Sequence, residues 1–205
     1  MLTQSENFGP FDVICTSGGY LSLLDMRSGE AARVLTMIAE IVRSVDDHPR
    51  YVNRLLDDRN WRGHLIAIAA VLVSAETARQ VSLLWRCFDR GSWVAPQLAV
   101  SLYCSDPGFA AEAKRRILAR CPIDDADGFF GGQTRDVSAK NLASLLRVMT
   151  YVPGDTRWTA SELDGHDVRE LLRADRDGAG PIVERWFDAA RARFRELGRD
   201  LKAAA

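Results

Sequence analysis

Residues 55–73 read LLDDRNWRGHLIAIAAVLV, and residues 89–105 read DRGSWVAPQLAVSLYCS. In each segment a polar run leads to a tryptophan, Trp61 or Trp93, and then to a run of mostly small and aliphatic residues as long as a buried helix. A second amphipathic segment follows each of these runs. Residues 50–121 therefore predict amphipathic helical hairpins that follow one another along the chain.

The predicted hairpins of this region span 61–88 and 93–120. Because Trp61 and Trp93 open them at equivalent positions, both indoles are expected inside the hairpin core. Trp85 lies on the apolar stripe of its helix and is expected there too. Tryptophan is thus interpreted as core material and not as a reactive group.

Helices are also expected on both sides of this region. Apolar residues recur at helical spacing up to Val45, and Pro49 fits the first turn of the short helix that follows. The candidate N-caps are Ser28, Asp58 or Asn60, Ser92 and Asp106. Downstream, periodicity and turn residues predict helices over 137–149, 161–173 and 182–202.

The chain has 205 residues, of which 47% are hydrophobic, and this suffices for one substantial core. We predict a single all-α domain over 1–205, built of stacked antiparallel helical hairpins, with an irregular helical bundle as the alternative. Residues 1–27 are expected to form an ordered N-terminal capping segment, in which 11–15 is read either as a short strand or as a packed extended segment. Residues 122–136, rich in Asp and Gly, are expected to form an exposed loop.

Charge and cysteine content restrict the setting of the protein. Its 28 acidic and 27 basic residues leave a net charge of -1, so no global field draws the chain to nucleic acid or to an anionic membrane. The longest apolar run, 65–73, is far shorter than the roughly 20 residues that span a bilayer. Four cysteines without C-x-x-C spacing and a polar N-terminus favour a cytoplasmic protein, and the excess of Arg over Lys is typical of GC-rich bacterial coding.

We predict no catalytic, metal or cofactor-binding residues. His48, His64 and His166 lack the spacing that places two imidazoles on one helical face. Residues 173–184 imitate a calcium-binding loop, but an arginine stands at the first ligand position, where a carboxylate is needed. The glycine cluster after Cys15 predicts a turn, and the sequence holds no glycine-rich nucleotide-binding fingerprint.

The segments Leu55-Leu56-Asp57-Asp58-Arg59-Asn60-Trp61-Arg62 and Asp89-Arg90-Gly91-Ser92-Trp93-Val94, each opening an apolar helix, resemble HEAT-like α-helical repeats. The resemblance covers roughly 50–121 and is architectural. Trp61 and Trp93 are 32 positions apart, a shorter period than the roughly 40–47 residues of HEAT units. The resemblance implies stacked hairpins whose second helices line a concave surface that receives a partner.

That geometry suggests a surface for a protein partner on the predicted second helices. The candidate residues are Arg79, Arg86, Lys114 and Arg115. The alternative is that these side chains simply face water, as most helical Arg and Lys do. The favoured function is a non-enzymatic protein-binding module of adaptor, regulatory or immunity type.

Nucleic acid is an alternative partner, because some HEAT-like proteins are DNA glycosylases, but it is disfavoured. Trp61, Trp85, Trp93, Asp57 and Arg86 supply similar ingredients. The near-zero net charge argues against a HEAT-like DNA-binding or DNA-processing protein.

The last predicted helix, 182–202, carries a heptad-like seam of apolar residues. The seam is formed by Val183, Phe187, Ala190, Phe194, Leu197 and Leu201. Fewer than three heptads rarely sustain an isolated coiled coil, so docking on the same chain is favoured over a homodimer formed through this helix.

Overall fold

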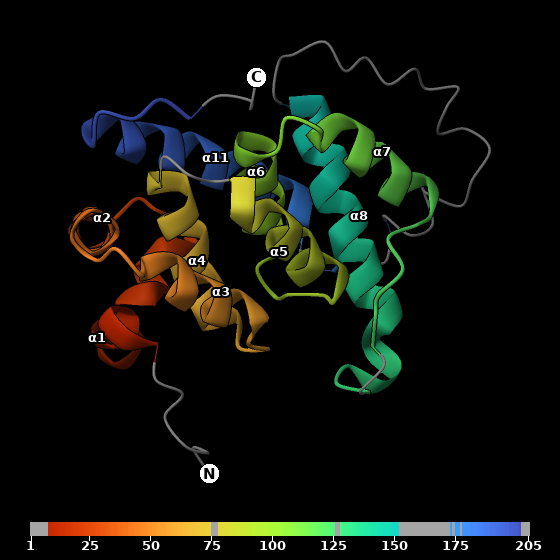
Figure 1. Ribbon diagram of the computed structural model, residues 1–205. Helices are drawn as coiled ribbons and strands as arrows, with labels where there is room; N and C mark the ends of the chain where they lie inside the picture. The colour runs from red at the N-terminus through yellow and green to blue at the C-terminus, as the bar shows by residue number, and fades with distance from the viewer. Residues whose placement is uncertain are drawn as a thin grey trace.

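The computed structural model describes residues 8–74, 78–125, 128–151, 173, 175–176 and 178–201. Within these ranges every regular element is helical, so the prediction of an all-α fold is confirmed (Figure 1). The helix predicted over 161–173, which includes His166, lies outside the described residues except at its last position.

The main helices are α2 (Gly29–Ser44), α3 (His48–Asp57), α4 (Trp61–Val73), α5 (Ala78–Asp89), α6 (Ala95–Ser105), α7 (Phe109–Leu118), α8 (Thr134–Tyr151) and α11 (Ala179–Glu196). Shorter helical segments precede α2 and α8. They are η1 (Gly9–Phe11), α1 (Asp12–Ser17), η2 (Gly19–Leu24) and η3 (Gly131–Gln133). In the described part of the chain, no helix combines the length and apolar character needed to cross a bilayer.

Several helix starts follow the predicted capping chemistry. The Ser28 hydroxyl accepts a hydrogen bond from the Ala31 amide at 3.1 Å, and the Asn60 side chain accepts one from the Arg62 amide at 3.1 Å. Pro49 lies in the first turn of α3, where a missing amide is not needed for the helix.

Two predicted caps are wrong. α6 begins at Ala95 and α7 at Phe109, so neither Ser92 nor Asp106 caps its helix. Asp106 instead accepts hydrogen bonds from the Gly108 amide at 2.8 Å and from Nε1 of Trp85 at 2.7 Å. Its carboxylate thereby links the turn before α7 to α5.

The helices form layers around a middle layer of α4, α6 and α8, in which each packs against the next (Figure 1). On one side, α3 packs against α4, α5 against α6, and α7 against α8. On the other side, η2 covers α4, and α11 covers α6 and α8. α2 packs against both α4 and η2.

This arrangement corrects the predicted hairpin pairing. The sequence pattern paired α4 with α5 and α6 with α7, whereas α4 packs chiefly with α3 and α6, and α6 packs more extensively with α5 than with α7. The reason is that α4 is buried along its length from Gly63 to Val73 and α6 from Ala95 to Leu102. Helices that are apolar all round need neighbours on several sides, and the preceding helix serves as well as the following one.

The N-terminal segment adds to the core. Phe11, Ile14, Leu23 and Met26 are fully or almost fully buried, and η1, α1 and η2, which hold the first three, contact α2 or α4. The proposed strand or extended segment over 11–15 is therefore wrong, because this stretch belongs to η1 and α1. Residues 122–125 and 128–130 lie in irregular backbone, and α8 begins at Thr134, before the expected end of the 122–136 loop.

The C-terminal helix docks on its own chain. α11 buries Val183, Trp186, Phe187, Ala190 and Phe194. The Nε1 group of Trp186 donates a hydrogen bond to the Leu23 carbonyl at 2.8 Å. The apolar face of α11 thus packs on α6 and α8 of the same chain, as the favoured docking prediction expected.

The tryptophans divide between core and surface. Trp85 is 6% exposed, as predicted. Trp93 is 56% exposed, so its expected place in the hairpin core is wrong, and Trp61 is only half-buried. Trp93 precedes the first residue of α6, and small and aliphatic side chains fill the space between α4 and α6.

A substitution that creates a cavity in the middle layer is expected to destabilise the fold. Leu98 is fully buried in α6, whereas Leu118 at the end of α7 is 43% exposed. We expect Leu98→Ala to lower the free energy of unfolding by about 3 kcal/mol. Leu118→Ala, the matched control, changes it by about 0.5 kcal/mol or less. Urea unfolding measures both, and equal effects of the two substitutions would contradict the layer assignment.

Candidate binding surface

Three partly exposed rings lie in sequence along one edge of the molecule, and we call Tyr20, Trp61 and Trp93 the aromatic row. The ring centroids of Tyr20 and Trp61 are 5.9 Å apart with the planes at 79°, and those of Trp61 and Trp93 are 4.9 Å apart with the planes at 47°. Trp61 opens α4, and Trp93 precedes α6. The row therefore follows the N-terminal ends of two neighbouring middle-layer helices.

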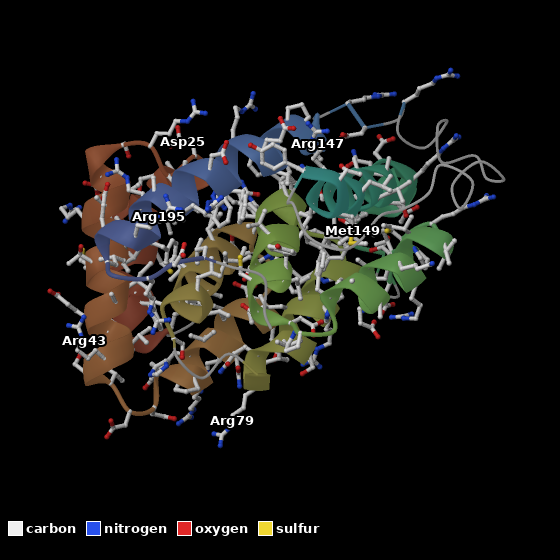
Figure 2. All side chains as sticks on the ribbon, turned by 90° about the horizontal axis from the view of Figure 1, so that it is seen from above. Asp25, Arg43, Arg79, Arg147, Met149 and Arg195 are labelled. Atoms are coloured by element: carbon white, nitrogen blue, oxygen red, sulfur yellow. The ribbon has the colours of Figure 1, made fainter. Side chains whose placement is uncertain are left out.

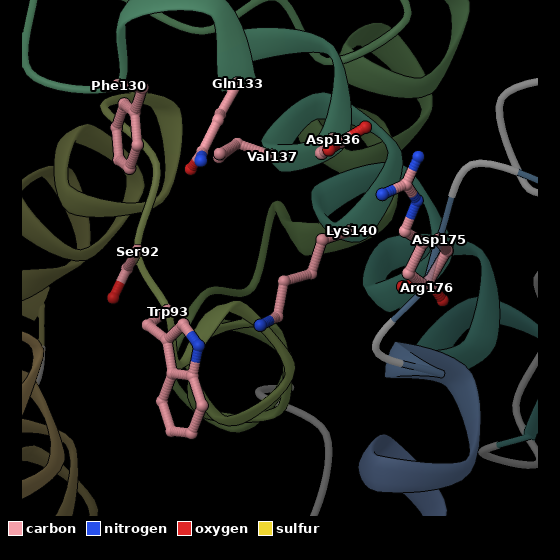
Figure 3. A pocket seen from close by; sticks show the side chains of 9 residues that line it. All are labelled: Ser92, Trp93, Phe130, Gln133, Asp136, Val137, Lys140, Asp175 and Arg176. Atoms are coloured by element: carbon pink, nitrogen blue, oxygen red, sulfur yellow. The ribbon is translucent and has the colours of Figure 1, made fainter.

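Cations lie against these rings. The Arg62 guanidinium is 5.1 Å from the Trp61 ring, and its Nε donates a hydrogen bond to the Tyr20 hydroxyl at 2.9 Å. The Lys140 ammonium extends from α8 to 5.0 Å from the Trp93 ring (Figure 3). Such cation–π contacts hold aromatic faces in place and give them a positive neighbour.

The loop that carries Trp93 is fixed by its neighbours. Arg90 donates hydrogen bonds to the carbonyls of Leu56 and Asp57 at the end of α3, at 2.6 and 3.0 Å. Gly91 has a φ of +82°, and a Cβ there would lie 2.7 Å from the Val137 side chain on α8. Only glycine combines this left-handed backbone with so close an approach, so the Trp93 indole projects from an ordered loop.

His64 and Ser92 tie the same loop to α4. The His64 Nε2 lies 2.6 Å from the Asp58 carbonyl, which only accepts, so Nε2 carries the proton. The unprotonated Nδ1 therefore accepts a hydrogen bond from the Ser92 hydroxyl at 2.8 Å. Burial lowers the pKa of His64 below its ordinary value of 6.5 and keeps the ring neutral.

This serine–histidine contact has the composition of a nucleophile and its base. However, Ser92 is 4% exposed, and its hydroxyl is engaged by the buried His64 ring at 2.8 Å. The Ser92 oxygen also accepts a hydrogen bond from the Val94 amide at 3.3 Å. The pair therefore orders the loop and presents no accessible nucleophile.

Two pockets flank Trp93, and both are lined by Trp93 and Lys140. The first, the α8 pocket, has a volume of about 270 Å³ (Figure 3). Its other lining residues are Ser92, Phe130, Gln133, Asp136, Val137, Asp175 and Arg176. The second, the α11 pocket, has a volume of about 470 Å³. Its other lining residues are Leu24, Asp25, Arg27, Val94, Pro96, Gln97, Ile182, Arg185 and Trp186.

The chemical groups of this edge are aromatic rings, cations and carboxylates. Among the described residues, no three metal-ligating side chains lie together. Burial, with help from Asp12, raises the pKa of the Cys15 thiol to about 11, so this cysteine is not a thiolate at neutral pH. Aromatic faces, cations and carboxylates beside open pockets can bind a ligand by stacking and by charge.

The residues predicted to bind a partner lie elsewhere. Arg79 and Arg86 are on α5, and Lys114 and Arg115 are on α7, in the layer opposite α11. Arg86 pairs with Asp57 at 3.4 Å and Arg115 with Glu112 at 3.0 Å. None of the four lines the α8 or α11 pocket.

The sequence did contain a signal for the exposure of Trp93. A proline belongs in the first turn of a helix, so Pro96 places the start of α6 at Ala95. Trp93 then falls outside the helix and its buried face. The sequence contains no such signal that Lys140 and Arg185 lie near Trp93, because only tertiary packing brings these residues together.

Comparison of the chain with models of protein families, with curated proteins and with solved structures finds no match.

The His64 contact predicts a dependence of stability on pH. Because the folded-state pKa of His64 lies below 6.5, the unfolded chain binds the proton first as the pH falls. The stabilisation is present above about pH 6.5 and is lost as the pH falls toward the folded-state pKa, with a slope of at most about 1.4 kcal/mol per pH unit. Urea unfolding at about pH 7.5 and 5.5 measures it.

The control for this prediction is His64→Gln. This variant is expected to be less stable at all pH values and to lose this part of the pH dependence. An unchanged dependence in His64→Gln would exclude His64 as its source.

Proposed function

We propose that this protein is a non-enzymatic protein-binding module that receives its partner on the aromatic row. The observation that carries the proposal is Trp93, which is 56% exposed, is held in an ordered loop and lines two pockets. Leaving so much indole surface in water is unfavourable. A partner that covers Trp93 removes this cost.

The composition of the edge fits a protein partner. Trp, Tyr and Arg are the residues that most often dominate protein–protein binding energy, and Trp61, Trp93, Tyr20 and Arg62 lie side by side here. The role is that of an adaptor, a regulator or an immunity-type protein. The free thiols of Cys15, Cys87, Cys104 and Cys121 support a reducing, cytoplasmic setting.

The hairpins α3–α4, α5–α6 and α7–α8 support a further proposal, a HEAT-like repeat array. The same pairing recurs along the chain, and α4, α6 and α8 lie side by side. Trp61 and Trp93, 32 positions apart, contact each other, as equivalent positions of adjacent repeats do. Superposition of α3–α4 on α5–α6 in an experimental structure tests this, and unrelated crossing geometries would reject it.

Selection of a phage-displayed random peptide library on the immobilised protein tests the binding function. We expect enriched peptides whose affinity falls about 30-fold, or about 2 kcal/mol, in Trp93→Ala, because the substitution removes a central contact. Leu118→Ala, also an exposed apolar residue, is the control and keeps the affinity. Selection of no peptide that depends on Trp93 would reject the proposal.

The second candidate is binding of single-stranded nucleic acid. It is favoured by the cations against Trp61 and Trp93, because bases stack on such rings while cations contact the phosphates. A gel shift with an oligothymidylate across salt concentrations decides it. No complex at low salt, where phosphate contacts are strongest, would reject nucleic acid.

A further inference from the structure

On the premise of the proposed protein-binding function, we infer that the α11 pocket receives an acidic side chain of the partner. In this arrangement the partner is an acidic peptide segment. One of its carboxylates enters between Arg27 and Arg185, and a neighbouring aliphatic side chain packs on Trp93.

The charges of the pocket carry the inference. Its lining contains the cations Arg27, Lys140 and Arg185 and one carboxylate, Asp25. The side chains of Arg27 and Arg185 form no ion pair within the described part of the chain. An entering carboxylate therefore finds guanidinium donors ready for charge-assisted hydrogen bonds, which are among the strongest in proteins.

The rest of the lining suits the stem of such a side chain. Trp93, Val94, Pro96, Ile182 and Trp186 supply apolar surface around the cations. Ligand pockets commonly combine apolar walls with a small number of placed polar groups. A volume of about 470 Å³ has room for more than one peptide side chain.

The wall that carries Arg27 is held in a fixed shape. Trp186 donates to the Leu23 carbonyl at 2.8 Å, and Gln97 donates to the Leu24 carbonyl at 3.2 Å. Arg193 donates to the carbonyls of Met26 at 3.0 Å and Arg27 at 2.7 Å. Each of these oxygens has a donor of its own, which weakens its repulsion of an entering carboxylate.

Met26 shows that this wall is strained. Its φ is +61°, a left-handed conformation that is unfavourable for a residue with a branched or long side chain. The hydrogen bonds from α6 and α11 maintain it. A segment held in such a conformation is pre-organised, so little ordering entropy is lost when the ligand binds.

The acids of the edge favour a peptide over nucleic acid. Asp25 lies in the α11 pocket, and Asp136 and Asp175 line the α8 pocket on the other side of Trp93. They interrupt the cationic track that a phosphate backbone needs. A peptide that carries an isolated carboxylate, with apolar or basic residues on either side, avoids this repulsion.

The experiment uses the full chain, with the phage-displayed random peptide library as the probe. Peptides selected on the wild-type protein are sequenced and then measured against the charge-reversed variant Arg27→Glu/Arg185→Glu. The control is Arg43→Glu/Arg50→Glu, which changes the net charge equally. Arg43 projects into solvent away from the side that carries Asp25 (Figure 2), and neither Arg43 nor Arg50 lines one of the two pockets. All these arginines are exposed, and thermal unfolding checks that both variants remain folded.

We expect the selected pool to be enriched in Asp and Glu over the starting library. These peptides bind about tenfold or more weakly to Arg27→Glu/Arg185→Glu and with little change to the control. Peptides that depend on Trp93 but show no acidic enrichment, and bind the charge-reversed variant equally, would overturn the inference and leave the proposed function standing. Absence of any peptide that depends on Trp93 would overturn both. An oligothymidylate that binds more tightly than the selected peptides, and is lost in the same variant, would overturn the acidic-peptide partner.

Discussion

The structure depends on covering α4 and α6, two helices that are apolar on almost every face. A helix of this kind has no side that can face water, so it folds only between other elements. The outer helices α3 and α5 cover one side, and η2 and α11 cover the other. Segments from both termini are thereby drawn onto the same side of the middle layer, where Nε1 of Trp186 donates a hydrogen bond to the Leu23 carbonyl.

The same constraint explains why the surface of interest lies at the helix ends. The lateral faces of α4 and α6 are used for packing, so only their ends and the preceding loops remain open. The Trp93 loop is held there by two contacts. Arg90 donates a hydrogen bond to the Leu56 carbonyl in α3, and the Ser92 hydroxyl is hydrogen-bonded to the buried His64 of α4. The proposed binding surface and the core thus share residues, because His64, which is buried against the core, also fixes the loop that carries the exposed indole.

The fold class and many helix bounds could be predicted from the sequence, because they follow from local patterns of residues. Asn60 and the apolar run behind it define α4, whose bounds agree with the expectation. The pairing of helices did not follow, since an all-apolar helix accepts either neighbour along the chain. The pockets were also out of reach: Arg27, Lys140 and Arg185 meet only through the packing of η2, α8 and α11. The exposure of Trp93 is the exception that could be predicted, because Pro96 indicates that α6 starts after Trp93.

Native-state hydrogen exchange of the backbone amides tests the central role of the middle layer most directly. We predict that amides in α4 and α6 exchange only through global unfolding, whereas amides in the outer helices α3 and α7 also exchange through smaller openings. Exchange of the α4 amides at a free energy as low as that of α3 would contradict it.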